Sequence, residues 1–174
     1  MPRLSIILAT WNAASTLERC LLSITGQTFA DWELLVADGA STDGTAEVIR
    51  RFEGRIGWWQ SRRDDGIYDA WNQAVAQARG EYVCFLGADD AWSDPAALQA
   101  LFDAIDAQGQ APDLVSARGL VASPDERPLA TIGARWDYPG IRRRMLICHP
   151  GAFHRRTLFA ALGPFDTRYR IAAE

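Results

Sequence analysis

The sequence predicts an α/β fold in which a mostly parallel sheet carries helices on both faces. Apolar runs of strand length alternate with segments whose apolar residues recur at helical spacing. Polar and acidic residues follow the predicted strands, where parallel sheets bind ligands. With 174 residues, of which 48% are hydrophobic, the chain can form one domain with a sizeable core.

The first predicted unit is a strand over residues 4–9 followed by a helix in the sequence ASTLERCLLSITGQ. The helix is indicated by apolar residues at positions 17, 20, 21 and 24, which fall on one face. Ser15 and Glu18 have the spacing of a capping box, in which side chains bind the free amides of the first turn.

The second unit repeats this pattern. A buried strand is predicted in WELLVAD, a turn in GASTDGT and a helix in AEVIRRF. Asp43 is the expected N-cap of that helix.

A third helix is predicted over residues 67–78, with Gly80 as its C-terminal stop. A strand follows in EYVCFLG, and then a helix in SDPAALQALFDAI, with Asp94 as N-cap and Pro95 at the first helical position. Beyond Asp113 the pattern loosens. There DLVSARGLVA is interpreted as a hairpin, and SPDERP and DYPG as turns.

The composition excludes several classes of protein. A net charge of −4, from 18 basic and 22 acidic residues, argues against a nucleic-acid binder. Three separated cysteines without a CxxC pair indicate neither a disulfide framework nor a zinc site, so a cytoplasmic location is expected. No apolar run approaches the roughly 20 residues that span a bilayer, which leaves a peripheral role at the inner membrane face open.

Two adjacent carboxylates, Asp89 and Asp90, follow the strand that ends at Gly87. They repel each other unless a cation or solvent separates them. Oxygen ligands suit Mg²⁺ or Mn²⁺, which commonly take one or two carboxylates and complete their coordination with water and substrate phosphate. The chain contains neither GxGxxG after its first strand nor GxxxxGK[ST], so a bound nucleotide would be held through a metal and side chains.

Four stretches together resemble the family-two nucleotide-sugar glycosyltransferases of GT-A fold. They are LSIILATWNAASTLERCLLSI, DWELLVADGASTDGT, DDGIYDAWNQAVAQARGEYVCFLGADD and CHPGAFHRRTLF with GPFDTRYRIAAE. The resemblance runs through nearly the whole chain in the right order. It implies a single GT-A domain over residues 1–174, with a Rossmann-like sheet and an inverting, metal-assisted transfer of sugar to an acceptor hydroxyl.

The resemblance assigns roles to residues in two groups. The first group binds the donor: the nucleoside is held after the first strand and at the end of the second, and a D-x-G-x-Y-D-A-x-N stretch borders the donor pocket. The second group binds Mn²⁺ or Mg²⁺ and the sugar diphosphate. The nucleotide-binding residues implied are Ala9, Thr10, Trp11, Asp38, Asp64 and Asp69, and the metal ligands implied are Asp89 and Asp90.

Two departures from the family pattern affect these assignments. Gly87 stands where the family commonly has Asn or Asp, so one potential metal contact is missing. Arg62 and Arg63 replace a Glu-Pro pair, which either alters donor contacts or places two solvated charges there.

The resemblance places the catalytic base at Glu174, the last residue, which would remove the proton of the acceptor hydroxyl. Because a helix should continue from this position, we expect the chain to stop short of the C-terminal end of its domain. His149 and His154 are more typical of structural histidines.

The resemblance implies a nucleoside-diphosphate sugar donor, with uridine diphosphate the commonest leaving group of the family, and a glycan or lipid-linked acceptor. The alternatives are a non-catalytic nucleotide-sugar binding module or inactive fragment, a glycoside hydrolase and a plain interaction domain. A hydrolase is disfavoured because Asp89 and Asp90 share one strand tip instead of flanking a sugar cleft. Arg142, Arg143 and Arg144 either meet phosphate or an anionic lipid surface or form a solvated basic turn.

Overall fold

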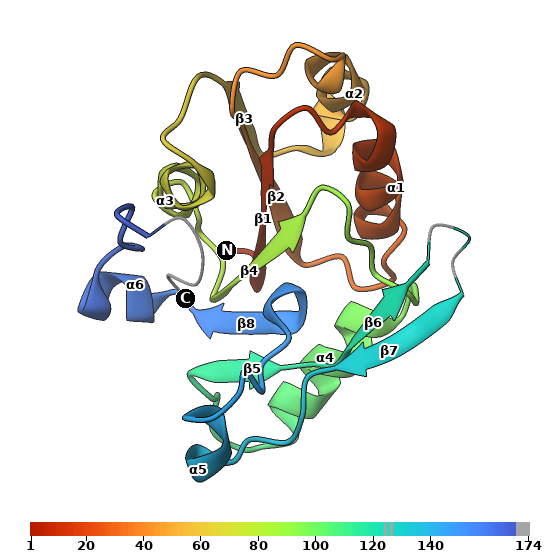
Figure 1. Cartoon of the computed structure of the whole chain (residues 1–174). Coiled ribbons are helices and arrows are strands. Elements are labelled where there is room, and N and C mark those ends of the chain that lie inside the picture. Colours follow the sequence, from red (N-terminus) through yellow and green to blue (C-terminus); the bar gives the residue numbers. More distant parts are fainter. Residues whose placement is uncertain (124, 126, 170–174) are drawn as a thin grey trace.

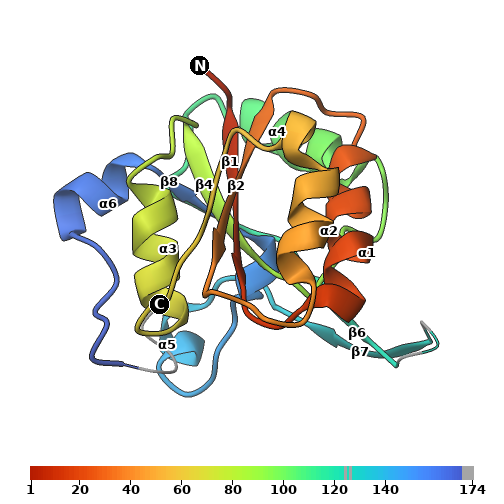
Figure 2. The same ribbon diagram turned by 90° about the horizontal axis from the view of Figure 1, so that it is seen from above.

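A six-stranded mixed sheet forms the centre of the computed structural model, which describes residues 1–123, 125 and 127–169. The predicted α/β fold with helices on both faces is confirmed (Figures 1 and 2). The strands of this sheet are, in spatial order, β3 (Trp58–Ser61), β2 (Trp32–Asp38), β1 (Leu4–Thr10), β4 (Tyr82–Gly87), β8 (Ala152–Arg155) and β5 (Leu114–Ser116).

The helices lie in two layers that sandwich the sheet. Figure 2 shows α1 and α2 on one side of β1 and β2, and α3 and α6 on the other. Their bounds are α1 (Ala14–Thr25), α2 (Thr45–Arg51), α3 (Ile67–Val75), α4 (Ala97–Asp106), α5 (Tyr138–Ile141) and α6 (Thr157–Leu162), with single 3-10 turns η1 (Glu53–Arg55) and η2 (His149–Gly151). In the part of the chain that the structure describes, no helix has the length and apolarity needed to cross a membrane.

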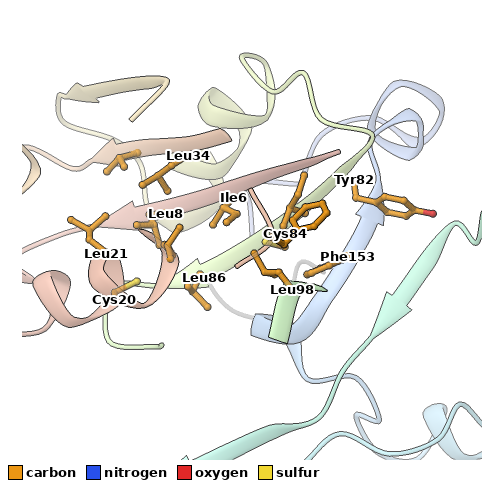
Figure 3. Close-up of a cluster of buried hydrophobic side chains, with 14 of the residues drawn as sticks. Ile6, Leu8, Cys20, Leu21, Leu34, Tyr82, Cys84, Leu86, Leu98 and Phe153 are labelled. Carbon is orange, nitrogen blue, oxygen red and sulfur yellow. The ribbon is translucent and has the colours of Figure 1, made fainter. Parts of the chain in front are cut away.

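Alternate residues of the central strands pack on opposite faces. Ile6 and Leu8 of β1 join a cluster beneath α1, α2 and α4, whereas Ile7 joins a second cluster beneath α3. Figure 3 shows the first cluster, in which Leu21 and Leu34 lie near Leu8. Because both faces are covered, β1 is a continuous apolar run, as buried parallel strands are.

The parallel strands bring their carboxyl ends to one edge of the sheet. In the parallel pairs, Thr10 of β1 is opposite Asp38 of β2, and Ala9 is opposite Gly87 of β4. β3 pairs in parallel with the other side of β2. The loops after these strands therefore meet at one edge, where α/β sheets bind ligands.

The second half of the chain corrects two expectations. The predicted hairpin over residues 113–122 is wrong, because β5 pairs antiparallel with β8 while β6 (Gly119–Ala122) pairs with β7 (Pro128–Ile132) in a separate two-stranded sheet. The hairpin instead turns within the predicted SPDERP segment, where the amide of Ser123 donates to the carbonyl of Arg127 (2.9 Å). β3 was not predicted, because the strand has only four residues and none of them is fully buried.

The predicted capping box of α1 is also wrong. The helix begins at Ala14, so Ser15 lies inside its first turn and makes no capping bond. The free amides are satisfied from the next loop: Ala14 donates to Asp43 Oδ2 (3.0 Å) and Ala13 to Thr45 Oγ1 (2.8 Å). Asp43 also accepts from the amide of Thr45 at the start of α2 (3.0 Å), so it serves both helices, although the N-cap position of α2 is Gly44.

The other helix ends shift by two or three residues. α3 ends at Val75, and Gly80 serves a different purpose from a helix stop. A Cβ on Gly80 would lie 2.5 Å from the amide nitrogen of Ser5, so a glycine is needed for β1 to approach. α4 starts at Ala97, beyond Pro95, and Asp94 accepts from the amide of Ala96 (2.7 Å) in the turn before it.

Candidate functional site

A cavity of about 630 Å³ opens at the edge where the parallel strands end. The loops after β1, β2 and β3 line it together with the segment after α6. Its volume is typical of small-molecule sites. The lining residues are Trp11, Gly39, Ala40, Arg63, Asp64, Asp65, Gly66, Ile67, Tyr68, Thr167 and Tyr169.

Trp11 presents its indole to this cavity and is 72% exposed. The loop that carries it is held by its neighbour Asn12, which has a left-handed backbone (φ 49°). The amide of Asn12 donates to Ser41 Oγ (2.8 Å), and its side-chain oxygen accepts from the amide of Thr42 (3.0 Å). A large exposed aromatic face on an anchored loop is suited to stacking on a flat base or a sugar.

Asp38 is the last residue of β2, next to the lining residue Gly39, and is almost fully buried. Oδ1 accepts from the hydroxyls of Thr10 (3.0 Å) and Ser41 (2.5 Å). Oδ2 accepts from the amide of Ser41 (3.0 Å) and the hydroxyl of Ser61 (2.5 Å). In this conformation Asp38 joins the ends of β1, β2 and β3. By these bonds Asp38 fixes the loops that line the cavity.

Asp64 lines the cavity, and its role in binding a nucleotide stays a prediction. A Cβ on Gly39 would lie 2.9 Å from Asp64 Oδ2 and 3.4 Å from Trp11 Cδ1, so glycine allows these two side chains to close over the backbone. The other oxygen of Asp64 accepts from the amide of Gly66 (2.9 Å). Ala40, next to Gly39, has φ 60°, a conformation that costs free energy for a residue with a side chain.

Asp69 does not line the cavity. Its Oδ2 accepts from the amide of Asp65 (3.2 Å) and from Gln73 Nε2 (2.9 Å), so it fixes the loop before α3. The two arginines of this loop also differ. Arg62 donates to Gln73 Oε1 (2.9 Å), whereas Arg63 lines the cavity and has no ion pair within residues 1–123, 125 and 127–169.

Asn72 of α3 holds the final described segment against this site. Its Nδ2 donates to the carbonyl of Phe165 (2.9 Å), and its Oδ1 accepts from the amide of the same residue (2.9 Å). This pair of bonds brings Thr167 and Tyr169 to the cavity. Thr167 and Tyr169 were not predicted, because their place depends on a contact between residues distant in sequence. Ala40, which follows the end of β2, was not predicted either.

The carboxylates of Asp89 and Asp90 converge above Gly87, at the end of β4. A Cβ on Gly87 would lie 2.8 Å from Asp89 Oδ1 and 2.8 Å from Asp90 Oδ2. Asp90 is half-buried and accepts from the amide of Gly87 (3.0 Å), whereas Asp89 is exposed. The pair lies on the far side of β1 from β2, so it adjoins the cavity without lining it.

The charge of this pair is poorly compensated. Burial raises the pKa of Asp90 above its ordinary value, and the neighbouring charge of Asp89 raises it further. The hydrogen bond from the Gly87 amide and the positive charge of Arg19 oppose this rise in pKa. Arg19 of α1 also donates to the backbone carbonyl of Asp89, so a cationic side chain holds this loop from the helix side.

The donor set fits a divalent cation that the protein holds jointly with a substrate. Among the described residues, no group of three His, Cys, Asp or Glu side chains could enclose a metal ion. The two converging carboxylates offer hard oxygen ligands on an open loop, and Mg²⁺ sites commonly use one or two carboxylates with substrate phosphates. The raised pKa of Asp90 is consistent with a place where a cation would favour the charged form.

The structure therefore brings together some of the predicted site residues and separates others. Trp11 and Asp64 share the cavity, and Asp89 and Asp90 share the neighbouring strand tip. Four predicted nucleotide-binding residues do not line the cavity in this conformation: Ala9, Thr10, Asp38 and Asp69. Glu174 lies outside the described residues, so its assignment as base stays a prediction.

The two histidines belong to a packed aromatic cluster. His149 stacks on Trp71 (4.8 Å between ring centroids), and His154 meets Phe85 edge-on (5.9 Å). Burial, and then the proximity of His149, lowers the pKa of His154 to about 4. A histidine that is neutral and enclosed among aromatic rings agrees with the structural role expected of it.

Comparison with known proteins identifies relatives for most of the chain. The profile of Glycosyl transferase family 2 matches residues 5–161. A PGL/p-HBAD biosynthesis glycosyltransferase of Mycobacterium bovis is 36% identical over 176 residues, covering 99% of this chain and 67% of that protein. An uncharacterized glycosyltransferase of Mycobacterium tuberculosis is 29% identical over 183 residues, covering 99% of this chain and 66% of its own length.

Solved structures share the fold. The crystal structure of S. aureus TarS superimposes with a TM-score of 0.77 at 21% identity, covering 99% of this chain and 32% of that one. A mannosyltransferase from Pyrobaculum calidifontis, solved in complex with GDP-Man and Mn²⁺, gives a TM-score of 0.67 at 26% identity, covering 95% of this chain and 48% of its own. The chain thus spans about two thirds of the curated relatives and a third to a half of the solved chains.

Proposed function

Because the chain belongs to glycosyl transferase family 2, we propose that it moves a sugar from a nucleoside-diphosphate sugar to an acceptor hydroxyl. The observation that carries this proposal is the position of two features at one sheet edge. The cavity between Trp11 and Asp64 has room for a nucleotide, and the paired carboxylates of Asp89 and Asp90 lie one strand away. A nucleotide in the cavity would extend its phosphates towards that pair.

The donor is a UDP-sugar in this proposal. TarS has been solved with UDP-GlcNAc, with a TM-score of 0.76 and coverage of 95% of this chain, and the Pyrobaculum mannosyltransferase with GDP-Man. Both complexes support a nucleotide sugar as the ligand class. Trp11 would stack on the flat part of the donor, and Arg63 would neutralise phosphate charge from the cavity rim.

Asp89 and Asp90 would hold Mn²⁺ or Mg²⁺ together with the diphosphate. The bound cation would stabilise the negative charge that develops on the departing nucleoside diphosphate. Arg19, through the carbonyl of Asp89, would keep this loop in place. The Pyrobaculum mannosyltransferase was solved with GDP-Man and Mn²⁺, which supports a divalent metal as a cofactor in this proposal.

The transfer proposed is a single displacement that inverts the anomeric carbon. A carboxylate base would take the proton of the attacking hydroxyl, and Glu174 is the predicted base. No covalent intermediate with the protein is needed in this scheme. The acceptor is a glycan or lipid-linked hydroxyl in a polysaccharide or glycan pathway, handled in the cytoplasm at the inner face of the membrane.

Calorimetry with UDP and Mn²⁺ tests the donor half of the proposal, with the two adjacent arginines as a matched pair. We expect Arg63→Ala to weaken UDP binding about tenfold, since one charge-assisted contact is removed. Arg62→Ala removes the same charge from a side chain bonded to Gln73, and it should change the affinity less than twofold. Equal effects of the two changes would contradict the assigned cavity.

The metal assignment and the turnover are tested separately. Replacing both Asp89 and Asp90 by Asn should abolish the increase in UDP affinity that Mn²⁺ produces, while metal-free binding persists. Release of UDP from a UDP-sugar that depends on an added acceptor would establish transfer. A protein that binds UDP and Mn²⁺ yet releases no UDP with any acceptor would be a binding module, and the catalytic proposal would fail.

A further inference from the structure

We propose that residues 117–147 form a surface that docks on an anionic membrane. This segment, called the docking surface below, contains the β6–β7 hairpin and the loop with α5. The inference goes beyond the proposed function by naming a membrane contact for an enzyme with a lipid-linked acceptor. Its test uses no nucleotide or sugar, so either proposal can fail without the other.

The docking surface concentrates exposed apolar side chains. In the described part of the chain, thirteen large hydrophobic residues are exposed, and seven of them lie here. Scattered exposed apolar residues are normal, but a concentration of this kind marks an interaction site. The seven are Leu120, Val121, Leu129, Ile132, Trp136, Tyr138 and Met145.

The hairpin turns two leucines towards solvent. In its register Leu120 is opposite Thr131, so these two share a face, and the register shift between Val121 and Ala122 leaves Leu129 as the extra residue of a β-bulge. These leucines are 58% and 66% exposed. Ile132 lies on the opposite face from Leu120, near Cys148, and is 43% exposed. The hairpin forms a two-stranded sheet of its own, and within the described residues these leucines are left largely uncovered.

The following loop adds two aromatic residues. The amide of Ala134 donates to the carbonyl of Leu146 (2.8 Å), which closes the loop at its base. Between these points Trp136 is 57% exposed and Tyr138 68%. Exposed Trp and Tyr side chains are suited to the membrane interface, because each has an apolar ring with one polar group.

The charge of the docking surface differs from that of the rest of the chain. Residues 117–147 contain six of the 18 basic residues and three of the 22 acidic ones, which leaves 12 basic and 19 acidic residues elsewhere. Arg135, Arg142, Arg143 and Arg144 are exposed, and within the described residues none of them has an ion-pair partner. By contrast, Arg51 on α2 pairs with Glu18 (3.2 Å).

The hairpin and α5 lie on the same side of the molecule in Figure 2, α5 towards the left and the hairpin towards the right. Figure 2 shows the N-terminus, where β1 begins, on one side of the molecule, and β6, β7 and α5 on the opposite side, where β1 and β2 end. Docking there would place the sheet edge with the candidate site near the membrane. The acceptor end of a lipid-linked glycan would then be presented on the same side as Asp89 and Asp90.

An anionic bilayer is complementary both to the exposed apolar side chains of the docking surface and to its unpaired arginines. Apolar side chains enter the interfacial region, while nearby arginines are attracted to lipid phosphates and acidic headgroups. Neither property alone gives stable attachment, because a few interfacial side chains or a few charges bind reversibly. The excess of unpaired arginine amid an otherwise acidic chain favours an anionic lipid partner over a second copy of this protein.

Cosedimentation with vesicles tests the proposal directly. Without nucleotide, the protein should sediment with vesicles containing phosphatidylglycerol and remain in solution with pure phosphatidylcholine. The triple change Arg142→Gln, Arg143→Gln, Arg144→Gln should weaken this binding about 100-fold, and the double change Leu120→Ser, Leu129→Ser at least tenfold. High salt should weaken the vesicle binding that depends on the arginine charges.

Matched control variants remove the same groups elsewhere. Arg50→Gln, Arg51→Gln, Arg55→Gln changes the net charge equally, and Leu22→Ser, Leu162→Ser removes two exposed leucines; neither should reduce binding. Circular dichroism verifies that every variant is folded. Equal binding to neutral vesicles, or equal losses in the control variants, would overturn the proposal. Sedimentation analysis in which the Leu120 and Leu129 changes convert a dimer to a monomer, with vesicle binding unchanged, would overturn it too.

Discussion

At the residue scale, Gly87 determines how the acidic pair is arranged. From the sequence, the resemblance to family two implies that a metal contact is missing at this position. The structure gives the glycine a different meaning. Asp89 and Asp90 both occupy the space that a side chain at position 87 would need. The absence of a side chain at this position is therefore what allows the two carboxylates to converge.

We expect Gly87→Ala to separate the carboxylates and weaken Mn²⁺-dependent UDP binding at least tenfold. The added methyl group would lie 2.8 Å from each carboxylate oxygen, closer than Cβ contacts occur, so both side chains must rotate away. Calorimetry with UDP in the presence and absence of Mn²⁺ measures the effect. Gly54→Ala, where a Cβ meets nothing within 4 Å, is the control. An unchanged metal dependence would show that the convergence has no role in metal binding.

At the element scale, single polar side chains connect elements that are distant in sequence. Asp43 binds the first amides of both α1 and α2, and Asp38 joins the ends of three strands. Asn72 has the same kind of role, since it is the side chain through which α3 holds the backbone at Phe165. Such connections keep the loops of the site in place although the loops have little packing of their own.

We expect Asn72→Ala to destabilise the protein by about 1–3 kcal/mol, because two backbone groups of Phe165 lose their partner. The change should also weaken UDP binding, since Thr167 and Tyr169 line the cavity from the segment that Asn72 holds. Urea denaturation and calorimetry measure the two effects. Gln77→Ala, an exposed amide just beyond the same helix, controls for the loss of an amide. If both variants unfold at the same urea concentration, Asn72 is not an anchor.

At the scale of the whole molecule, the two halves of the chain differ in how far the sequence predicts them. In the first half, the continuous apolar run that contains Ile6, Ile7 and Leu8 predicts a buried strand from adjacent residues alone, and the predicted unit is confirmed. In the second half, β8 joins the sheet through partners far away in sequence, since Phe153 pairs with Cys84 and Val115. Local patterns contain no information on such pairings, so the hairpin was placed wrongly.

The candidate site likewise contains residues that the local sequence predicts and residues whose place depends on tertiary contacts. Trp11 and Asp64 were predicted because they follow strands or match a local motif, and both line the cavity. That Asp38 is bonded through both oxygens depends in part on Ser61, which is distant in sequence and meets Asp38 only in the folded chain. Thr167 likewise lines the cavity because of a tertiary contact, the pair of hydrogen bonds between Asn72 and the backbone of Phe165.

An aromatic cluster connects the two halves, and His154 makes this connection sensitive to acid. Trp71 and Phe85, from α3 and β4, pack against His149, Phe159 and Phe165 from the second half. His154 lies in the same cluster with its pKa lowered to about 4, chiefly by burial. It is therefore neutral in the folded protein at pH values where an unfolded chain protonates its histidines.

We expect the free energy of unfolding to fall by about 2 kcal/mol between pH 6.5 and pH 5, because the unfolded state takes up a proton that folded His154 does not bind. The contribution is fully present above the unfolded histidine pKa of about 6.5 and decreases until the pH reaches the folded value. His154→Phe, which keeps an aromatic ring in the cluster, should flatten this slope. Urea denaturation at pH 7, 6 and 5 compares the two proteins. The interval lies above the usual carboxylate pKa values, so most of the slope reports the histidine. Equal slopes in both proteins would mean that His154 is accessible to protons in the folded state and that the cluster does not seal the junction between the halves.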